Sequence, residues 1–428
     1  MNIGYACQVI GLHNMKLKSC LAKNADDVVL TAIIKHNLAV LDNMIEYNIK
    51  NGIKLFRISS DIIPFASNSV NKLPWWDMFA PSFQALGEKI VSAGIRVSMH
   101  PGQYTVLNSV NKNVVKNTIA DLDYHTLFLD SLGVGEECKI VLHIGGIYGN
   151  KKQAIERFLT NYSYLEPCVK KRLVLENDDK CYNIDEVLEI AAKLNMPVVF
   201  DNLHNQLNPY DISKKDNYWL ELAQKTWQQK DGRQKIHYSQ QNLFKPKGAH
   251  SETILIKDFM LFFEGLLNKD IDIMLEVKDK NLSAVKCMNS IAENPQIKLL
   301  GVEWNRYKYK ILENSPNDYL KIRELLNDKS GYPAIAFYES IESALTKEVL
   351  KGNAINTALH IWGYFKNEVS VQEKAVFFKK LEAYQQGIIS VKPIKEYLWK
   401  LVNQYGQNYL AGSYYFTILN NHELRRRI

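Results

Sequence analysis

The chain has 428 residues, of which 46% are hydrophobic and 23% are charged. This composition is typical of a folded protein with a large core, and it excludes a disordered or low-complexity chain. The 53 basic and 46 acidic residues give a net charge of +7, which mildly favours a polyanionic partner. The length fits one (β/α)8 barrel with a smaller second domain better than it fits three equal domains.

Neither a membrane-spanning segment nor a secretory signal is expected. No apolar run approaches the roughly 18 residues needed to cross a bilayer. Met1–Leu12 has no basic stretch that leads into an apolar core. The six cysteines are scattered and form no C-x-x-C pair, so we expect a reduced, cytoplasmic protein without a thiolate metal site and without a membrane partner.

Strand-like and helix-like segments alternate from Asn2 to about Ala292. The strand candidates are nearly continuous apolar runs, as expected for a parallel sheet that is covered on both faces. These eight candidates are Ile3–Cys7, Leu55–Ser59, Arg96–Met99, Lys139–His143, Leu173–Glu176, Val198–Phe200, Lys235–His237 and Ile273–Val277. Helical spacing occurs between them, over Asn37–Asn48, Pro81–Ala93, Asn117–Leu132, Ile184–Leu194, Ile256–Leu267 and Leu282–Ile291.

Eight successive β/α units favour a closed parallel barrel, and an open doubly wound sheet is the competing fold. No G-x-G-x-x-G follows a strand, so the nucleotide-binding form of the open sheet has no support. We therefore predict an α/β fold, a (β/α)8 TIM barrel over residues 1–310, without a nucleotide cofactor.

The sequence changes character after Glu303. Asn327–Pro333 is rich in Gly, Pro and Asn, and only helical patterns follow it. Five helices are predicted there, over Ser340–Leu350, Asn356–Phe365, Val371–Gln386, Ile394–Tyr405 and Tyr409–Leu419. We predict a linker over residues 311–333 and a small all-α domain over residues 334–428, whose basic end, Arg425–Arg427, is a solvated terminus.

Polar residues gather where the predicted strands end. Five of the ten histidines and three carboxylates lie there: His100, His143, Glu176, Asp201, His204, His237, His250 and Glu276. A single histidine of this kind is more often a hydrogen-bonded core residue than a ligand. In a barrel, however, the carboxyl ends of the strands converge on one mouth, so all eight side chains are expected to share one space.

These residues supply eight nitrogen and oxygen donors and no sulfur. One zinc ion takes three or four ligands, so the set predicts a cluster of two or three divalent ions, with Mn²⁺ or Zn²⁺ as candidates. Such clusters favour phosphoryl chemistry, because the ions bind phosphate, activate water and neutralise the leaving oxygen. Isomerisation of a sugar is the main alternative use of a divalent-metal barrel.

Six motifs in chain order carry a resemblance to a known family. They are Ile3-Gly4-Tyr5, Arg57–Ser60, His100–Tyr104, Leu175–Asp179, Lys235–Ser239 and Glu276–Lys280. Through these motifs, the segment from Asn2 to Arg306 resembles the ultraviolet-damage endonucleases. The resemblance implies a TIM barrel of the type found in endonuclease IV and xylose isomerase.

The resemblance also implies an activity and a cofactor. The eight residues named above would hold three Mn²⁺ ions, with Zn²⁺ or Mg²⁺ as alternatives, and Glu176 and Lys235 would be catalytic. The phosphodiester bond immediately 5′ to a cyclobutane pyrimidine dimer or a 6-4 photoproduct would be cut, leaving a 3′-hydroxyl and a 5′-phosphate. The implied partner is duplex DNA that carries photolesions, and we expect the protein to act as a monomer.

Further roles follow from the same resemblance. Lys235 would either carry a carboxylated Nζ, which adds an oxygen donor, or pair unmodified with the phosphate; the sequence leaves both open. Gln103 and Tyr104 match the pair that enters the duplex at the lesion, and Tyr5 is expected to serve in both catalysis and lesion binding. Taken alone, Tyr104 would be a rim tyrosine and Tyr5 a core tyrosine.

One position departs from the family. Val9 stands where related enzymes have an Asn, which puts one polar contact to the lesion in question, with Gln8 or Asn14 as substitutes.

The C-terminal region lies outside the endonuclease resemblance. Leu359–Lys366 and Tyr384–Gly387 resemble an uncharacterised small helical domain found fused to other bacterial proteins, so no activity is assigned to it. For the whole chain we favour the photolesion endonuclease. An abasic-site endonuclease without photolesion preference is the second hypothesis, and a catalytically silent damage-binding protein is the third. The complete ligand set argues against the third.

Overall fold

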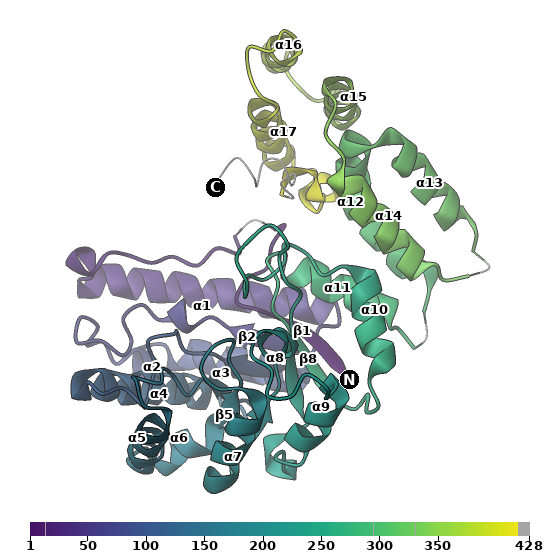
Figure 1. Ribbon diagram of the computed structural model, residues 1–428. Helices are drawn as coiled ribbons and strands as arrows, with labels where there is room; N and C mark the ends of the chain where they lie inside the picture. Colours follow the sequence, from purple (N-terminus) through teal and green to yellow (C-terminus); the bar gives the residue numbers. More distant parts are fainter. Residues whose placement is uncertain (13, 294, 330, 418–428) are drawn as a thin grey trace. The chain divides into compact units, whose positions relative to one another are not determined.

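The computed structural model of the protein describes residues 1–12, 14–293, 295–329 and 331–417 (Figure 1). Eight parallel strands form one sheet, in the order β6-β5-β4-β3-β2-β1-β8-β7. Their bounds are β1 Asn2–Ala6, β2 Leu55–Ile58, β3 Arg96–Met99, β4 Ile140–Leu142, β5 Leu173–Glu176, β6 Val198–Val199, β7 Lys235–Tyr238 and β8 Asp272–Leu275.

The sheet curls into a nearly closed barrel. The backbone N–H of His237 on β7 donates to the carbonyl of Phe200, 3.0 Å away, and a parallel bridge pairs Asp201 with His237, so β7 meets the end of β6. Almost every strand residue is buried, because helices cover the outside and side chains fill the inside. The predicted TIM barrel and its eight strands are confirmed.

Helices follow the strands around the barrel (Figure 1). They are α1 Asp27–Lys50, α2 Trp75–Met78, α3 Ala80–Ser92, α4 Lys112–Ser131, α5 Lys151–Ser163, α6 Pro167–Arg172, α7 Ile184–Leu194, α8 Asn202–Leu207, α9 Asp216–Gln224, α10 Ile256–Gly265 and α11 Asn281–Ser290. Helix α1 begins earlier than the pattern from Asn37 predicts. Its N-cap is Asp26, whose side chain accepts a hydrogen bond from the N–H of Val29.

Among the described residues, α1 is the helix long and apolar enough to cross a membrane by length and composition. Half of its apolar window is buried in the structure, and its buried residues include Asn37 and Asn48. This burial is typical of a core helix. The sequence analysis found no such run, because polar residues interrupt the apolar ones along α1.

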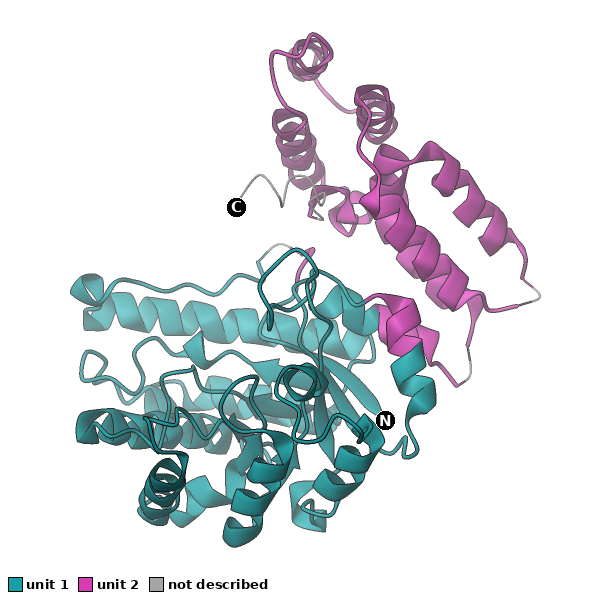
Figure 2. Ribbon diagram, in the orientation of Figure 1, with its two compact units in different colours: residues 1–9, 14–254, 261–285 teal, residues 10–13, 255–260, 286–428 magenta. Residues whose placement is uncertain are grey.

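The chain divides into two compact units (Figure 2). Unit 1 comprises residues 1–9, 14–254 and 261–285, and unit 2 comprises residues 10–13, 255–260 and 286–428. The helices that begin within 286–428 are α12 Ile297–Asn314, α13 Pro316–Asn327, α14 Ala334–Thr346, α15 Lys351–Trp362, α16 Val371–Gln385, α17 Lys392–Gln404 and α18 Asn408–Ala411.

The expected linker over residues 311–333 is mostly helical, which corrects that prediction. The end of α12 and all of α13 occupy it, and both helices contact α14. Ser315 caps α13 by accepting from the N–H of Asp318, and Pro316 fits the first turn, where its missing N–H costs nothing. The tail Arg425–Arg427 and the end of the last predicted helix lie outside the described residues.

The helical unit has its own apolar core, centred on α15, α16 and α17. The rings of Trp362 and Phe377 stack with centroids 4.3 Å apart and planes 5° apart. Phe365, Leu398 and Leu401 are completely buried beside them. A separate core of this kind allows the unit to gain or lose stability by itself.

Replacing Phe377 by alanine should lower the unfolding free energy of the helical unit by about 3–5 kcal/mol, because a buried aromatic ring leaves a cavity. Calorimetric unfolding of the full chain would measure the change. Val371→Ala on the same helix removes a side chain that is 87% exposed, so it should change stability little. An equal shift from both variants would contradict the assignment of this core.

Candidate metal centre

The predicted site residues come from six neighbouring strands. Glu176 ends β5 and His237 lies in β7, while the others follow strands β3, β4, β6, β7 and β8. The carboxyl ends of parallel barrel strands meet at one mouth, which is why residues distant in sequence meet here. The structure brings all eight predicted residues together.

Glu176 is at the centre of the group, and it is 1% exposed. Its Oε2 lies 3.1 Å from His100 Nε2 and 3.4 Å from His143 Nε2. Its Oε1 lies 2.7 Å from His237 Nδ1 and 3.7 Å from His204 Nδ1. Four imidazoles therefore surround one buried carboxylate.

A second carboxylate, Glu276, extends the group. Its Oε1 lies 3.3 Å from His237 Nδ1, and its Oε2 lies 3.6 Å from His250 Nε2. His204 Nδ1 is 3.9 Å from Asp201 Oδ1, and it is also 2.8 Å from the carbonyl oxygen of Asn177, to which it can donate.

Three overlapping sets of side chains can each hold a metal ion, and Glu176 belongs to all of them. The sets are His100–His143–Glu176, Glu176–Asp201–His204 and Glu176–His237–Glu276, each with donor atoms within 4.8 Å of one another. Asp201 Oδ2, His143 Nδ1 and His237 Nε2 are buried and have no hydrogen-bond partner in the part of the chain that the structure describes. Buried polar atoms are normally paired, so these atoms fit a site that binds cations.

Two of the three carboxylates, Glu176 and Glu276, have a lowered pKa. Burial acts to raise the pKa of Glu176, but the neighbouring His237 and His143 hold it well below its usual range. Burial acts on Glu276 in the same way, and Arg57 and His237 hold its pKa well below the usual range. Both groups are therefore anionic at neutral pH and ready to bind a cation.

Asp201 behaves differently from the two glutamates. Burial, with the charges of Glu176 and Glu276, raises its pKa to about 7 despite the opposing effect of His204. Burial lowers the pKa of His143 to about 4, which leaves a neutral imidazole of the kind that metals bind. His204 shows the opposite shift from His143, because the charges of Asp201 and Glu176 raise its pKa to about 9 despite its burial.

Lys235 lies in the barrel beneath these groups. It is two residues before His237 on β7, so both side chains point to the same side of the strand. Its Nζ is buried and has no hydrogen-bond partner among the described residues. Burial, with the charges of Arg96 and Arg57, lowers its pKa to about 7. A neutral amine is therefore well populated at physiological pH.

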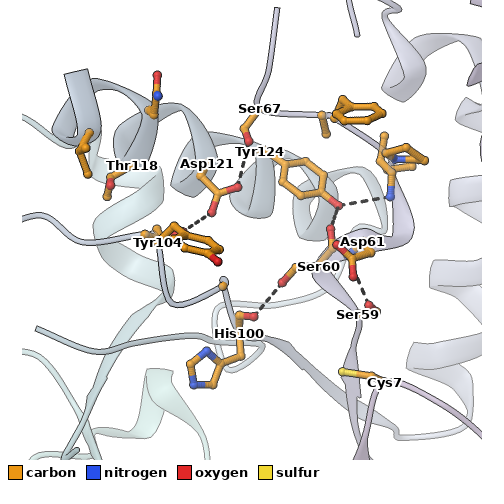
Figure 3. Close-up of a pocket in the computed structure, with 18 residues that line it drawn as sticks. Cys7, Ser59, Ser60, Asp61, Ser67, His100, Tyr104, Thr118, Asp121 and Tyr124 are labelled. Carbon is orange, nitrogen blue, oxygen red and sulfur yellow. Dashed lines mark hydrogen bonds between the residues drawn. The ribbon is translucent and has the colours of Figure 1, made fainter. Parts of the chain in front are cut away.

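Gln103 and Tyr104 lie on the loop after β3, and both are exposed, Tyr104 by 80%. Tyr104 lines a cavity of about 570 Å³ together with His100, so the loop borders both the cavity and the metal-binding group (Figure 3). This placement leaves both side chains accessible to a large ligand at the mouth.

The two ends of that loop are fixed by hydrogen bonds (Figure 3). Ser60 Oγ donates to the carbonyl oxygen of His100 over 2.7 Å, and Thr105 Oγ1 donates to Asp121 Oδ2 over 2.6 Å. The exposed pair Gln103–Tyr104 is therefore carried by an anchored loop and not by a free one.

Tyr5 does not join the site, contrary to the prediction. It is completely buried, and its hydroxyl donates to Asn48 Oδ1 on α1, 2.7 Å away. Its ring packs against Phe56, so the side chain points outward from the barrel into the layer beneath α1. Val9 is also buried, whereas Gln8 and Asn14 are exposed.

Arg57 was missed as a functional residue by the sequence analysis. It forms an ion pair with Glu276, and both side chains are nearly buried. The sequence does contain a signal for this role, because Arg57 is a single arginine within the apolar strand Leu55–Ile58. A buried cation at such a position requires an anionic partner. The identity of that partner, 219 residues away, was not readable from the sequence.

A barrel whose mouth gathers histidines and carboxylates around one glutamate defines a class of hydrolytic and isomerising enzymes that use divalent metals. The chain belongs to the UV-endonuclease UvdE family, whose model matches residues 1–308. It is accordingly a UV-damage repair endonuclease that acts on DNA. A second family model, described as a protein of unknown function (DUF1722), matches residues 308–419.

Individual relatives agree with the family. The UV DNA damage endonuclease of Clostridium perfringens (strain 13 / Type A) is 40% identical over 417 residues, which cover 94% of this chain and 96% of that protein. The UV DNA damage endonuclease of Bacillus cereus (strain G9842) is 34% identical over 275 residues, covering 64% and 86%. The crystal structure of SacUVDE matches with a TM-score of 0.64 and 36% identity, covering 68% of this chain and 98% of that chain.

Replacing Glu176 by glutamine should weaken Mn²⁺ binding by more than about tenfold, because even changes outside the ligand shell cost 10–100-fold. Calorimetric titration with Mn²⁺ would measure the affinity, and circular dichroism would show that the fold persists. Glu88→Gln alters an exposed carboxylate on α3 and should leave binding unchanged. Unaltered Mn²⁺ affinity of the Glu176 variant would contradict the central role of this carboxylate.

Proposed function

We propose that the protein cuts DNA immediately 5′ to cyclobutane pyrimidine dimers and 6-4 photoproducts, leaving a 3′-hydroxyl and a 5′-phosphate. One observation carries the proposal: three sets of potential metal-binding side chains share buried Glu176, with His250 beside Glu276, at the mouth of a barrel of the UV-endonuclease family. The protein would act on duplex DNA in the cytoplasm as a monomer.

Glu176 and the seven other predicted ligands would hold three Mn²⁺ ions, with Zn²⁺ or Mg²⁺ as alternatives. When bound, such ions polarise the phosphodiester, lower the pKa of water and neutralise the leaving oxygen. Glu176 lies within 3.7 Å of four of the five histidines, so it would be the ligand that the three sets of side chains share. Arg57 holds Glu276 in place for the same task.

Hydrolysis at this site would proceed by attack of a water oxygen on phosphorus. The bond between phosphorus and O3′ breaks, the downstream fragment keeps the phosphate at its 5′ end, and the leaving O3′ takes up a proton to become the 3′-hydroxyl.

Lys235 is proposed to assist catalysis in one of two forms. The neutral form of its buried amine can add carbon dioxide and release a proton to form a carboxylated Nζ, which would give the site another oxygen donor. Unmodified and protonated, it would stabilise the charge of the phosphate instead. The absence of a hydrogen-bond partner for Nζ among the described residues is compatible with either form.

Gln103 and Tyr104 are proposed to recognise the lesion. A damaged dinucleotide costs less to unstack than an intact one, and an exposed aromatic ring can replace part of the lost stacking. The 80% exposure of Tyr104 and the anchoring of its loop support this role. The cavity beside Tyr104 offers space for an extruded part of the substrate.

With Mn²⁺, the protein should cut an irradiated duplex and leave intact duplex uncut. End-labelled duplexes with one defined photoproduct would locate the cut, and ligation or polymerase extension would identify the 3′-hydroxyl. An abasic duplex provides the decisive comparison. Preferential cutting of the abasic duplex would favour an abasic-site endonuclease, and binding without cutting would indicate a silent damage-binding protein.

Replacing Tyr104 by alanine should reduce the preference for irradiated over intact duplex by about tenfold, because stacking on a base is worth about 1–3 kcal/mol. Binding to intact duplex should change little, since phosphate contacts supply most of it. Affinities for both duplexes would be measured in chelator. Tyr164→Ala, at the end of α5 and 68% exposed, is the matched control. Equal losses on both duplexes would show that Tyr104 does not read the lesion.

A further inference from the structure

Backbone hydrogen bonds hold together the two ends of the loop over residues 241–250, which follows β7. Residues Gln241 and His250 form an antiparallel bridge at its base, and the N–H of Asn242 donates to the carbonyl of Ala249 over 2.7 Å. The loop therefore begins and ends at one place, beside His250, whose ring lies near Glu276.

Two polar side chains inside the loop hold its tip in place. Gln241 Oε1 accepts from the N–H of Gly248 over 2.8 Å, and Gln241 Nε2 donates to the carbonyl of Pro246 over 3.1 Å. Asn242 Oδ1 accepts from the N–H of Phe244 over 3.0 Å. Because these bonds span the loop in several directions, its tip has a defined position relative to the metal-binding group.

The tip itself is apolar. Leu243 is 85% exposed and Phe244 is 81% exposed. Lys245 and Lys247 come directly after them, and Lys247 is exposed. Exposed apolar side chains next to lysines are typical of a binding surface. The lysines favour a partner with a negatively charged surface, and the apolar side chains favour one with an apolar interior.

The strand order places this loop opposite the Gln103–Tyr104 loop. Strands β3 and β7 are four positions apart around the barrel in either direction, so the loops that follow them lie on opposite sides of the mouth. The metal-binding group lies between, with His100 after β3 and His237 on β7. A duplex that crosses the mouth with its backbone at Glu176 would reach both loops.

We propose that Leu243 and Phe244 form a second wedge, which enters the duplex on the far side of the scissile phosphate from Gln103 and Tyr104. Apolar wedges of Leu and Phe unstack a base step and kink DNA, and the bent duplex then contacts more protein surface. The two wedges then flank the scissile phosphate, with Gln103 and Tyr104 at the lesion and Leu243 and Phe244 on the undamaged 5′ side. This inference rests on the proposed function, because it requires the mouth to be the DNA-binding face.

The double variant L243S/F244S tests the wedge in the full-length protein. An irradiated duplex with 2-aminopurine beside the lesion, kept uncut by chelator, reports affinity by anisotropy and unstacking by fluorescence. The variant should bind about tenfold more weakly and lose part of the unstacking signal, since base stacking contributes on this scale. F244W, which keeps an aromatic ring, should retain most of both.

Leu267→Ser is the matched control. Leu267 is 75% exposed and precedes β8, at the end of the barrel away from the mouth, so its replacement should leave affinity and unstacking unchanged. A cysteine in place of Phe244 should form a disulfide with a thiol tethered to a base near the lesion. Cross-linking to the same extent from a cysteine at position 267 would overturn the proposal.

The outcomes separate the wedge from the function on which it rests. Wild-type protein that does not prefer irradiated over intact duplex would refute the proposed function. If the wild type shows this preference and L243S/F244S binds and unstacks equally well, only the wedge is refuted. A change in oligomeric state with unchanged DNA affinity would mark the tip as a protein contact and would also overturn the wedge.

Discussion

The burial of the Glu176 carboxylate at the barrel mouth is the constraint on which the site depends. A lone ionised carboxylate in such a place is costly, and it persists only where partners compensate for the lost hydration. His100, His143 and His237 supply that compensation within 3.4 Å. The same imidazoles are metal ligands by chemistry, so the arrangement that stabilises the buried charge is also the one that can gather cations.

The charges of neighbouring residues also govern the other two carboxylates at the mouth, Glu276 and Asp201. Glu276 is held by Arg57 and His237, whereas Asp201 carries a pKa raised to about 7 through burial and the charges of Glu176 and Glu276. The protonation of each buried group at the mouth is therefore set by its neighbours and not by its residue type alone.

The barrel separates the buried cluster of histidines and carboxylates from the exposed loops at its mouth. Glu176 and His237 belong to strands, whose positions are fixed by hydrogen bonds to their neighbours on the sheet. Tyr104 and Phe244 belong to loops on opposite sides of the same mouth, and both loops are braced by side-chain hydrogen bonds. Substrate contacts can therefore change by loop substitution without disturbing the cluster.

The sequence by itself determined the eight strands and the polar side chains at their ends, because short buried runs are a local signal and barrel topology brings strand ends together at one mouth. It did not determine which way Tyr5 faces, which anion pairs with Arg57, or that residues 311–327 pack as helices. Those outcomes depend on contacts between residues far apart in the chain. No local pattern encodes such contacts, so only the tertiary structure decided them.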